Sequence, residues 1–244
     1  MIQKDSIYST PLDKVSHFQF DEAVARVFPD MIRRSVPGYS QLIPMIGLVT
    51  EHFAQSGTAC YDLGCSLGAS TLAMRHGLKD KDCRLIAVDN SESMIERCRH
   101  YIELDNETTS VELVCADILE IDFAPCSVVT LNFTLQFIAP ELREALLTRI
   151  YQALTPGGVL ILSEKVALPN SDASAAHPLE QLHWLFKKAN GYSELEISQK
   201  RSALENVMVP DSLDTHVQRL RQAGFRQSHP WFQCFNFVSL LAIK

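Results

Sequence analysis

The sequence predicts an α/β fold, in which helices cover both faces of a mostly parallel sheet of seven strands. Between residues 58 and 162, short apolar runs alternate with longer stretches of helical periodicity. Such alternation is typical of βαβ units, whose strands run parallel. A glycine-rich turn also joins the first apolar run to the first helical stretch. Because doubly wound sheets bind ligands at such turns, we expect a Rossmann-like architecture.

The chain before the first strand predicts an N-terminal helical arm over residues 1–56. One helix is expected near residues 20–28, and apolar residues on one broad face predict a second over 41–53. The Pro37-Gly38 dipeptide separates the two helices, because proline followed by glycine favours a turn.

The first five strands are expected where short apolar runs end at a polar or glycine residue. These runs are 58–63, 83–88, 111–115, 127–131 and 159–162. Helical patterns lie between them: one over 69–76, one for which Asn90 or Ser91 can serve as the cap, and one that begins at Pro140 and stops at residues 156–158.

The pattern changes after Ser163. Residues 164–210 predict a polar, helical lid or insertion, with a loop over 169–178 and a break near Asn190-Gly191. Water exclusion from a reaction site is the function that such a lid would serve.

The end of the chain returns to the sheet. A last helix closes at Gly224, and two strands are expected over 225–228 and 234–243. Because no helix separates these two strands, they should be antiparallel to each other. We therefore expect a single domain over residues 1–244.

The composition is that of a globular protein with a full core, since 46% of the 244 residues are hydrophobic and 21% are charged. A net charge of −7 without a long basic run argues against tight direct binding of nucleic acid. No secretory signal or membrane-spanning run is visible, so we expect a cytoplasmic protein. The seven cysteines show no C-x-x-C or zinc spacing, which predicts reduced thiols and no metal.

The glycine-rich turn over residues 61–68 is close to a dinucleotide fingerprint but departs from it at Ser66. A dinucleotide site has its second glycine there, so that the backbone can approach a pyrophosphate. The turn can still direct backbone N–H groups at an anion, starting from Gly64. It is better suited to a nucleoside with a small charged tail, such as S-adenosylmethionine. A turn without a ligand is the alternative, and Cys65 lacks the basic sequence neighbours of a nucleophile.

A polar residue lies at or just after the end of each of four successive strands, and the carboxyl ends of parallel strands meet at one edge of a sheet. They are Asp62, Asp89, Asp117 and Asn132. Asp89 could accept the ribose hydroxyls of an adenosine, Asp117 with Ile118 could contact the adenine, and Asn132 could reach the amino-acid part. Each aspartate could instead be a helix cap or a turn residue. Their common register favours a ligand site.

Several sequence blocks together are specific to one family. They are residues 27–32, 34–39, 61–68, 132–137, 189–201 and 231–237. Over nearly its full length the chain closely resembles the bacterial carboxy-S-adenosyl-L-methionine synthase family, which belongs to the methyltransferase superfamily. The glycine turn alone indicates only the superfamily, whereas the blocks before Tyr39 and around Arg201 are more specific to this family.

The resemblance implies that the chain converts S-adenosylmethionine and prephenate to carboxy-S-adenosylmethionine and phenylpyruvate. It implies a homodimer whose product a partner enzyme uses to carboxymethylate a wobble uridine in tRNA. The family's ligand contacts correspond to Tyr39, Gly64, Cys65, Ser66, Asp89, Asn90, Asp117, Ile118, Asn132 and Arg201. Of these, Arg201 and Tyr39 are the expected catalytic residues. Tyr192 is a candidate donor near the reacting end and equally a packing residue.

The chemistry gives Arg201 a physical role. The product carries a carboxylate beside a sulfonium, and an arginine fork binds a carboxylate through two parallel hydrogen bonds. Without the resemblance, Arg201 reads as a surface arginine in a polar helix. Two other functions remain open at this point: an ordinary S-adenosylmethionine-dependent methyltransferase, and a non-catalytic carrier of the nucleoside.

Overall fold

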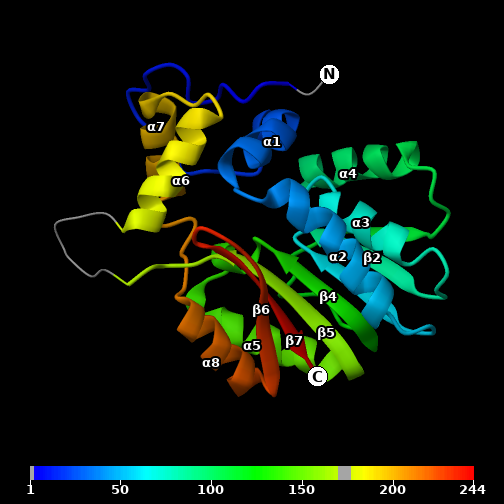
Figure 1. Cartoon of the computed structure of the whole chain (residues 1–244). Coiled ribbons are helices and arrows are strands. Elements are labelled where there is room, and N and C mark those ends of the chain that lie inside the picture. The colour runs from blue at the N-terminus through cyan, green and yellow to red at the C-terminus, as the bar shows by residue number, and fades with distance from the viewer. Residues whose placement is uncertain (1–2, 170–176) are drawn as a thin grey trace.

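A seven-stranded sheet forms the centre of the computed structural model, which describes residues 3–169 and 177–244 (Figure 1). Its strands are β1 (Ala59–Leu63), β2 (Arg84–Asp89), β3 (Val111–Cys115), β4 (Cys126–Asn132), β5 (Leu154–Lys165), β6 (Gln227–Cys234) and β7 (Phe237–Ile243). Their order across the sheet is β3-β2-β1-β4-β5-β7-β6. β1 to β5 pair in parallel, whereas β7 runs antiparallel to β5 and β6. The predicted α/β class and its antiparallel C-terminal end are confirmed.

Helices connect the parallel strands, and in α1, α4, α6, α7 and α8 the side chain just before the helix accepts a hydrogen bond from a free backbone N–H group of the first turn. The helices are α1 (Glu22–Ser35), α2 (Tyr39–Phe53), α3 (Ala69–Gly77), α4 (Glu92–Leu104), η1 (Leu135–Phe137), α5 (Pro140–Ala153), α6 (Pro178–Ala189), α7 (Glu194–Leu204) and α8 (Leu213–Ala223). Of the two predicted caps for α4, Ser91 is the one used, because its side chain accepts a hydrogen bond from the Met94 N–H. Ser193 and Glu196 form a reciprocal capping box at α7.

The core lies on both faces of the sheet, because alternate residues of each strand point to opposite sides. On one face, Tyr61 and Val129 pack in a cluster with apolar residues of α5 and α8. On the other, Cys60 and Val128 pack with residues of α2 and α3, such as Ile46. Figure 1 shows α1, α6 and α7 gathered beyond one end of the sheet, apart from these two layers.

The structure corrects three predicted boundaries. α1 continues to Ser35, well beyond residue 28, with Pro29 inside it. β5 begins at Leu154 and so includes residues 156–158, which the sequence indicated as a break before the strand. The first of the two last strands covers Gln227–Cys234 rather than 225–228. β6 is an edge strand, where Pro230 removes no hydrogen bond to a further neighbour, so the proline that obscures the pattern is tolerated.

The predicted lid region contains α6 and α7, with the expected break at Asn190-Gly191 between them. Most of the loop predicted over 169–178 falls at residues 170–176, which lie outside the described part of the chain. None of the helices within residues 3–169 and 177–244 combines the length and the hydropathy that crossing a membrane requires.

Candidate active site

A cavity of about 980 Å³ lies where the carboxyl ends of the strands meet α1, α6 and α7. Every predicted ligand residue lines it: Tyr39, Gly64, Cys65, Ser66, Asp89, Asn90, Asp117, Ile118, Asn132 and Arg201. Tyr192 lines it too. The fold thus brings residues from the glycine turn, three further strand ends and the distant α7 to one space.

Gly64 and Ser66 of the glycine turn both have a positive φ. Gly64 has φ +77°, and a Cβ there would lie 2.4 Å from both Cγ2 and Oγ1 of Thr134. Only glycine therefore fits this position without displacing its neighbour. Ser66 also has a positive φ, +50°, which is uncommon for a residue with a side chain.

Asp89 fastens the glycine turn to the end of β2. Its Oδ2 accepts a hydrogen bond from the Ser66 N–H at 2.9 Å, and its Oδ1 accepts one from the Ser91 N–H at 2.9 Å. Burial raises the pKa of this carboxyl, and the two N–H donors oppose the shift. A carboxylate oxygen accepts more than one hydrogen bond, so Asp89 can both hold Ser66 and receive hydroxyl groups from a ligand.

Asn132 presents a buried acceptor with no partner. Its Nδ2 donates to Ser70 Oγ at 3.0 Å, while its Oδ1 is buried and accepts no hydrogen bond from the described residues. A buried acceptor left unpaired is costly, and a ligand ammonium would satisfy it. Asp117, in contrast, has a local role as well, because its Oδ1 accepts from the Leu119 N–H at 2.9 Å.

Asp62 is the strand-end residue that does not line the cavity. It is almost fully buried, and its Oδ2 accepts a hydrogen bond from Thr71 Oγ1 at 2.6 Å. Burial raises its pKa to about 7. Its strand position alone did not distinguish this internal carboxyl from the ones that face the cavity.

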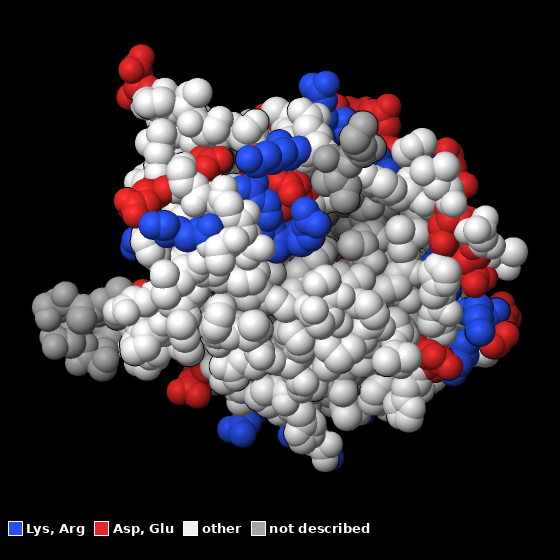
Figure 2. Space-filling model, turned by 45° about the horizontal axis from the view of Figure 1, so that its top comes forward, with Lys and Arg blue, Asp and Glu red and all other residues white. Residues whose placement is uncertain are grey.

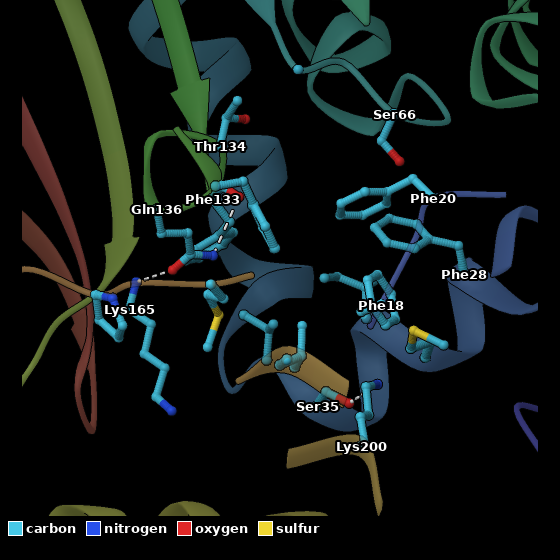
Figure 3. A pocket seen from close by; sticks show the side chains of 18 of the residues that line it. Phe18, Phe20, Phe28, Ser35, Ser66, Phe133, Thr134, Gln136, Lys165 and Lys200 are labelled. Carbon is cyan, nitrogen blue, oxygen red and sulfur yellow. Dashed lines mark hydrogen bonds between the residues drawn. The ribbon is translucent and has the colours of Figure 1, made fainter. Parts of the chain in front are cut away.

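Phenylalanines form a wall that the sequence reasoning missed. Phe18, Phe20, Phe28 and Phe137 line the cavity, and Phe20 makes edge contacts with the other three at ring distances of 5.1 to 6.2 Å. Figure 3 shows Phe20 next to Ser66, with Phe28 and Phe18 further from it. Ser91 Oγ donates to the Phe20 carbonyl at 2.6 Å, which fixes the N-terminal arm next to the glycine turn.

A group of cations forms another part of the wall, and the sequence reasoning identified only one of them. Lys165 ends β5, Lys187 lies in α6, and Lys200 and Arg201 lie in α7. Burial, together with the charges of Lys165 and Arg201, lowers the pKa of Lys187 to about 8. Burial likewise lowers the pKa of Lys200 to about 8. Burial is also the main reason that the pKa of Lys165 is lowered.

The two tyrosines differ in their surroundings. Burial, with Asp62 nearby, raises the pKa of Tyr39 well above its usual value, so its hydroxyl stays protonated as a donor. The Tyr192 hydroxyl donates to Asp5, and the Arg34 guanidinium lies 3.8 Å from its ring centre. These contacts give Tyr192 the packing role that the sequence left as its alternative.

Several known proteins are similar in sequence to this chain. A family described as "Methyltransferase domain" matches residues 61–158. A carboxy-S-adenosyl-L-methionine synthase of Marinobacter nauticus is 62% identical over 227 residues, which cover 93% of this chain and 90% of the relative. One of Escherichia coli is 55% identical over 244 residues, covering all of this chain and 98% of the relative. The chain belongs to the carboxy-S-adenosyl-L-methionine synthase family.

Solved methyltransferase structures share the fold of this family member. An O-methyltransferase family protein from Burkholderia thailandensis superposes with a TM-score of 0.64 at 14% identity, covering 92% of this chain and 60% of that one. Human N-acetylserotonin methyltransferase in complex with S-adenosylmethionine superposes with a TM-score of 0.59 at 16% identity, covering 91% and 55%. The chain thus spans under two thirds of their length.

Over residues 3–169 and 177–244, no cluster of three metal-ligating side chains is found.

Proposed function

We propose that the chain converts S-adenosylmethionine and prephenate to carboxy-S-adenosylmethionine, phenylpyruvate and water. The observation that carries the proposal is one cavity with two chemically different parts. Residues of the glycine turn and the strand ends supply acceptors for a nucleoside with an ammonium group, and α6, α7 and β5 supply cations for a carboxylate. The names of the relatives agree with this pairing of ligands.

The nucleoside half would bind as the strand ends suggest. Asp89 receives the ribose hydroxyls, Ile118 contacts the adenine ring, and the free Oδ1 of Asn132 accepts from the ammonium group. Asp117 accepts a hydrogen bond from the adenine amino group. The turn that begins at Gly64 would bring its backbone close to the sulfonium side of the ligand, and Gly64 can keep this turn because it has no Cβ to clash with Thr134.

The proposed reaction balances without a further reagent. Prephenate loses its ring carboxyl group as carbon dioxide and its ring hydroxyl as hydroxide, and the ring becomes aromatic. The hydroxide removes a proton from the S-methyl group, which gives water and a sulfonium ylide. The ylide carbon then bonds to carbon dioxide, and the new carboxylate forms on what was the methyl carbon. Tyr39, kept protonated by its surroundings, is a hydrogen-bond donor beside these groups.

Arg201 is the proposed receiver of the new carboxylate, because its fork can form two parallel hydrogen bonds to it. The helices α6 and α7, which belong to the described part of the predicted 164–210 lid, would keep water from the ylide and the carbon dioxide. Together with residues 1–56 and the sheet they would form a single domain.

The cellular role follows from the product. A sulfonium that carries a carboxymethyl group is a donor for a transferase, and we propose that a tRNA-modifying partner uses it on a wobble uridine. The chain's own net charge of −7 gives it little attraction for tRNA, so the small product rather than the nucleic acid would pass between the enzymes. We further propose a homodimer in the cytoplasm.

The test is incubation of the purified protein with both substrates. Phenylpyruvate should form faster than prephenate decays alone, together with an equal amount of carboxylated nucleoside. Methylation of an added acceptor without carboxylation would instead indicate an ordinary methyltransferase. Binding of the nucleoside with no phenylpyruvate above the spontaneous rate would indicate a carrier.

The Arg201→Ala variant tests the role of the arginine. It should weaken binding of carboxy-S-adenosylmethionine by about tenfold or more, because a charge-assisted pair is lost, and change S-adenosylmethionine binding little. Titration calorimetry with each nucleoside measures both. Equal weakening of the two ligands would show that Arg201 does not bind the carboxylate.

A further inference from the structure

The cations that line the cavity differ in whether they have partners. Lys200 Nζ donates to Ser35 Oγ at 3.1 Å and lies 3.8 Å from Asp5 Oδ2, so it joins α7 to α1 and the N-terminal arm. Neither Lys165 nor Lys187 makes a side-chain hydrogen bond or an ion pair within 4.0 Å with any described residue. Their charges are therefore not used in holding the fold.

These two lysines approach the cavity from different elements. Lys165 extends from the end of β5 (Figure 3), and Lys187 comes from the second half of α6. Lys187 is close enough to Lys165 and Arg201 for both to lower its pKa. Lysine and arginine side chains gather beside a recess of the surface in Figure 2. The charge of the Glu180 carboxylate raises the pKa of Lys165, against the lowering by burial.

The like charges of Lys165, Lys187 and Arg201 repel one another, and the Glu180 carboxylate partly offsets this repulsion at Lys165. Such an arrangement persists at a cost to stability, and an anion of charge two lowers that cost. Arg201, in the proposed function, binds the carboxylate that is transferred. A dicarboxylic donor has a second carboxylate, which is not transferred and is still present in the product that the donor becomes.

We propose that Lys165 and Lys187 bind the carboxylate that the dicarboxylic donor retains, separately from the group that Arg201 receives. This inference rests on the proposed function and deepens it. The lysines would select a dianionic donor over a monoanion and place its ring carboxyl group toward Arg201. They are positioning residues for the donor and have no part in binding the nucleoside.

The test uses the variants Lys165→Gln and Lys187→Gln, which keep the length of the side chain and remove its charge. Each should raise KM for prephenate roughly tenfold or more, the loss expected for one hydrogen bond to a charged group. The dissociation constant of S-adenosylmethionine, measured by calorimetry, should not change. Lys187→Arg should restore most of the prephenate affinity, because it restores the charge.

A matched control lies next to Lys187 in the same helix. Lys188 pairs with Glu194 at 2.9 Å and lies 4.5 Å from the ring centre of Trp184, and it does not line the cavity. Lys188→Gln removes the same charge from the same helix and should leave KM for prephenate as in the unaltered protein. An equal rise in Lys188→Gln would show that the effect is one of overall charge.

The pH dependence gives a second readout. Because the pKa of Lys187 is lowered to about 8, kcat/KM for prephenate should fall as pH rises above about 8. The charged and titratable groups that interact with Lys187 are Lys165, Arg201, Lys200 and His183, and Glu180 acts on the neighbouring Lys165. His183, whose pKa burial lowers to about 3, stays neutral across this range. Lys187→Arg should remove the fall, since arginine keeps its charge there.

Stability distinguishes binding from a structural role. Because neither lysine holds another residue, both glutamine variants should melt at the same temperature as the unaltered protein or higher. Normal turnover with unchanged KM in both variants would overturn the inference and leave the proposed function intact. If the unaltered protein neither turns over prephenate nor binds it in calorimetry with S-adenosylmethionine present, the proposed function and this inference both fail.

Discussion

Gly64→Ala tests whether the glycine turn is built around a position that no side chain can occupy. The residue has φ +77°, and in the left-handed region alanine costs about 1–2 kcal/mol relative to glycine. The added Cβ would lie 2.4 Å from two atoms of Thr134, and overpacking of this kind costs about 1–3 kcal/mol. The free energy of unfolding should fall by about 2–5 kcal/mol, less whatever the turn recovers by moving.

Urea denaturation measures this loss, and calorimetry with S-adenosylmethionine measures the effect on the cavity that Gly64 lines. The control is Thr134→Ala, alone and combined with Gly64→Ala. Because it removes both atoms at 2.4 Å, the double variant should recover the steric share of about 1–3 kcal/mol and not the backbone share. A single variant within about 0.5 kcal/mol of the unaltered protein, with unchanged ligand affinity, would refute this reasoning.

Three other predictions follow from the contacts. Asp89→Asn should weaken S-adenosylmethionine about tenfold or more in calorimetry, because one carboxylate oxygen with its backbone N–H partner is lost; unchanged affinity would contradict the role of Asp89. Arg143→Met should lower the free energy of unfolding by about 3–5 kcal/mol in urea, since Arg143 is fully buried and paired with Asp211, and a loss below about 1 kcal/mol would count against that pairing. Tyr192→Phe should lower stability by about 1–3 kcal/mol and leave kcat near normal; a large fall in kcat with normal stability would instead make Tyr192 a donor to the substrate.

The sequence was most informative where local physical rules decide the structure. The strand ends at Asp89 and Asn132 could be predicted because an apolar run followed by a polar residue marks where a buried strand reaches the surface. The capping of α4 by Ser91 follows from a similarly local rule. Asp62 met the same rule and still points into the protein, since the pattern does not say which way a side chain turns.

The cationic half of the cavity was not predictable in the same way. Lys165 and Lys187 lie on different elements and show no motif, so only the fold brings them together with Arg201. The phenylalanine wall has the same origin, because it joins the N-terminal arm to η1. The boundary of β6 was wrong because Pro230 and the register shift after it conceal an edge strand.

The mass of the nucleoside that forms on the protein is the most direct test of the central claim. The purified protein is incubated with S-adenosylmethionine and prephenate, and the nucleoside is then released and weighed by mass spectrometry. The account predicts a species heavier than S-adenosylmethionine by one carbon dioxide, in amounts that match the phenylpyruvate formed. Recovery of only S-adenosylmethionine or its demethylated product, with prephenate in excess, would contradict it.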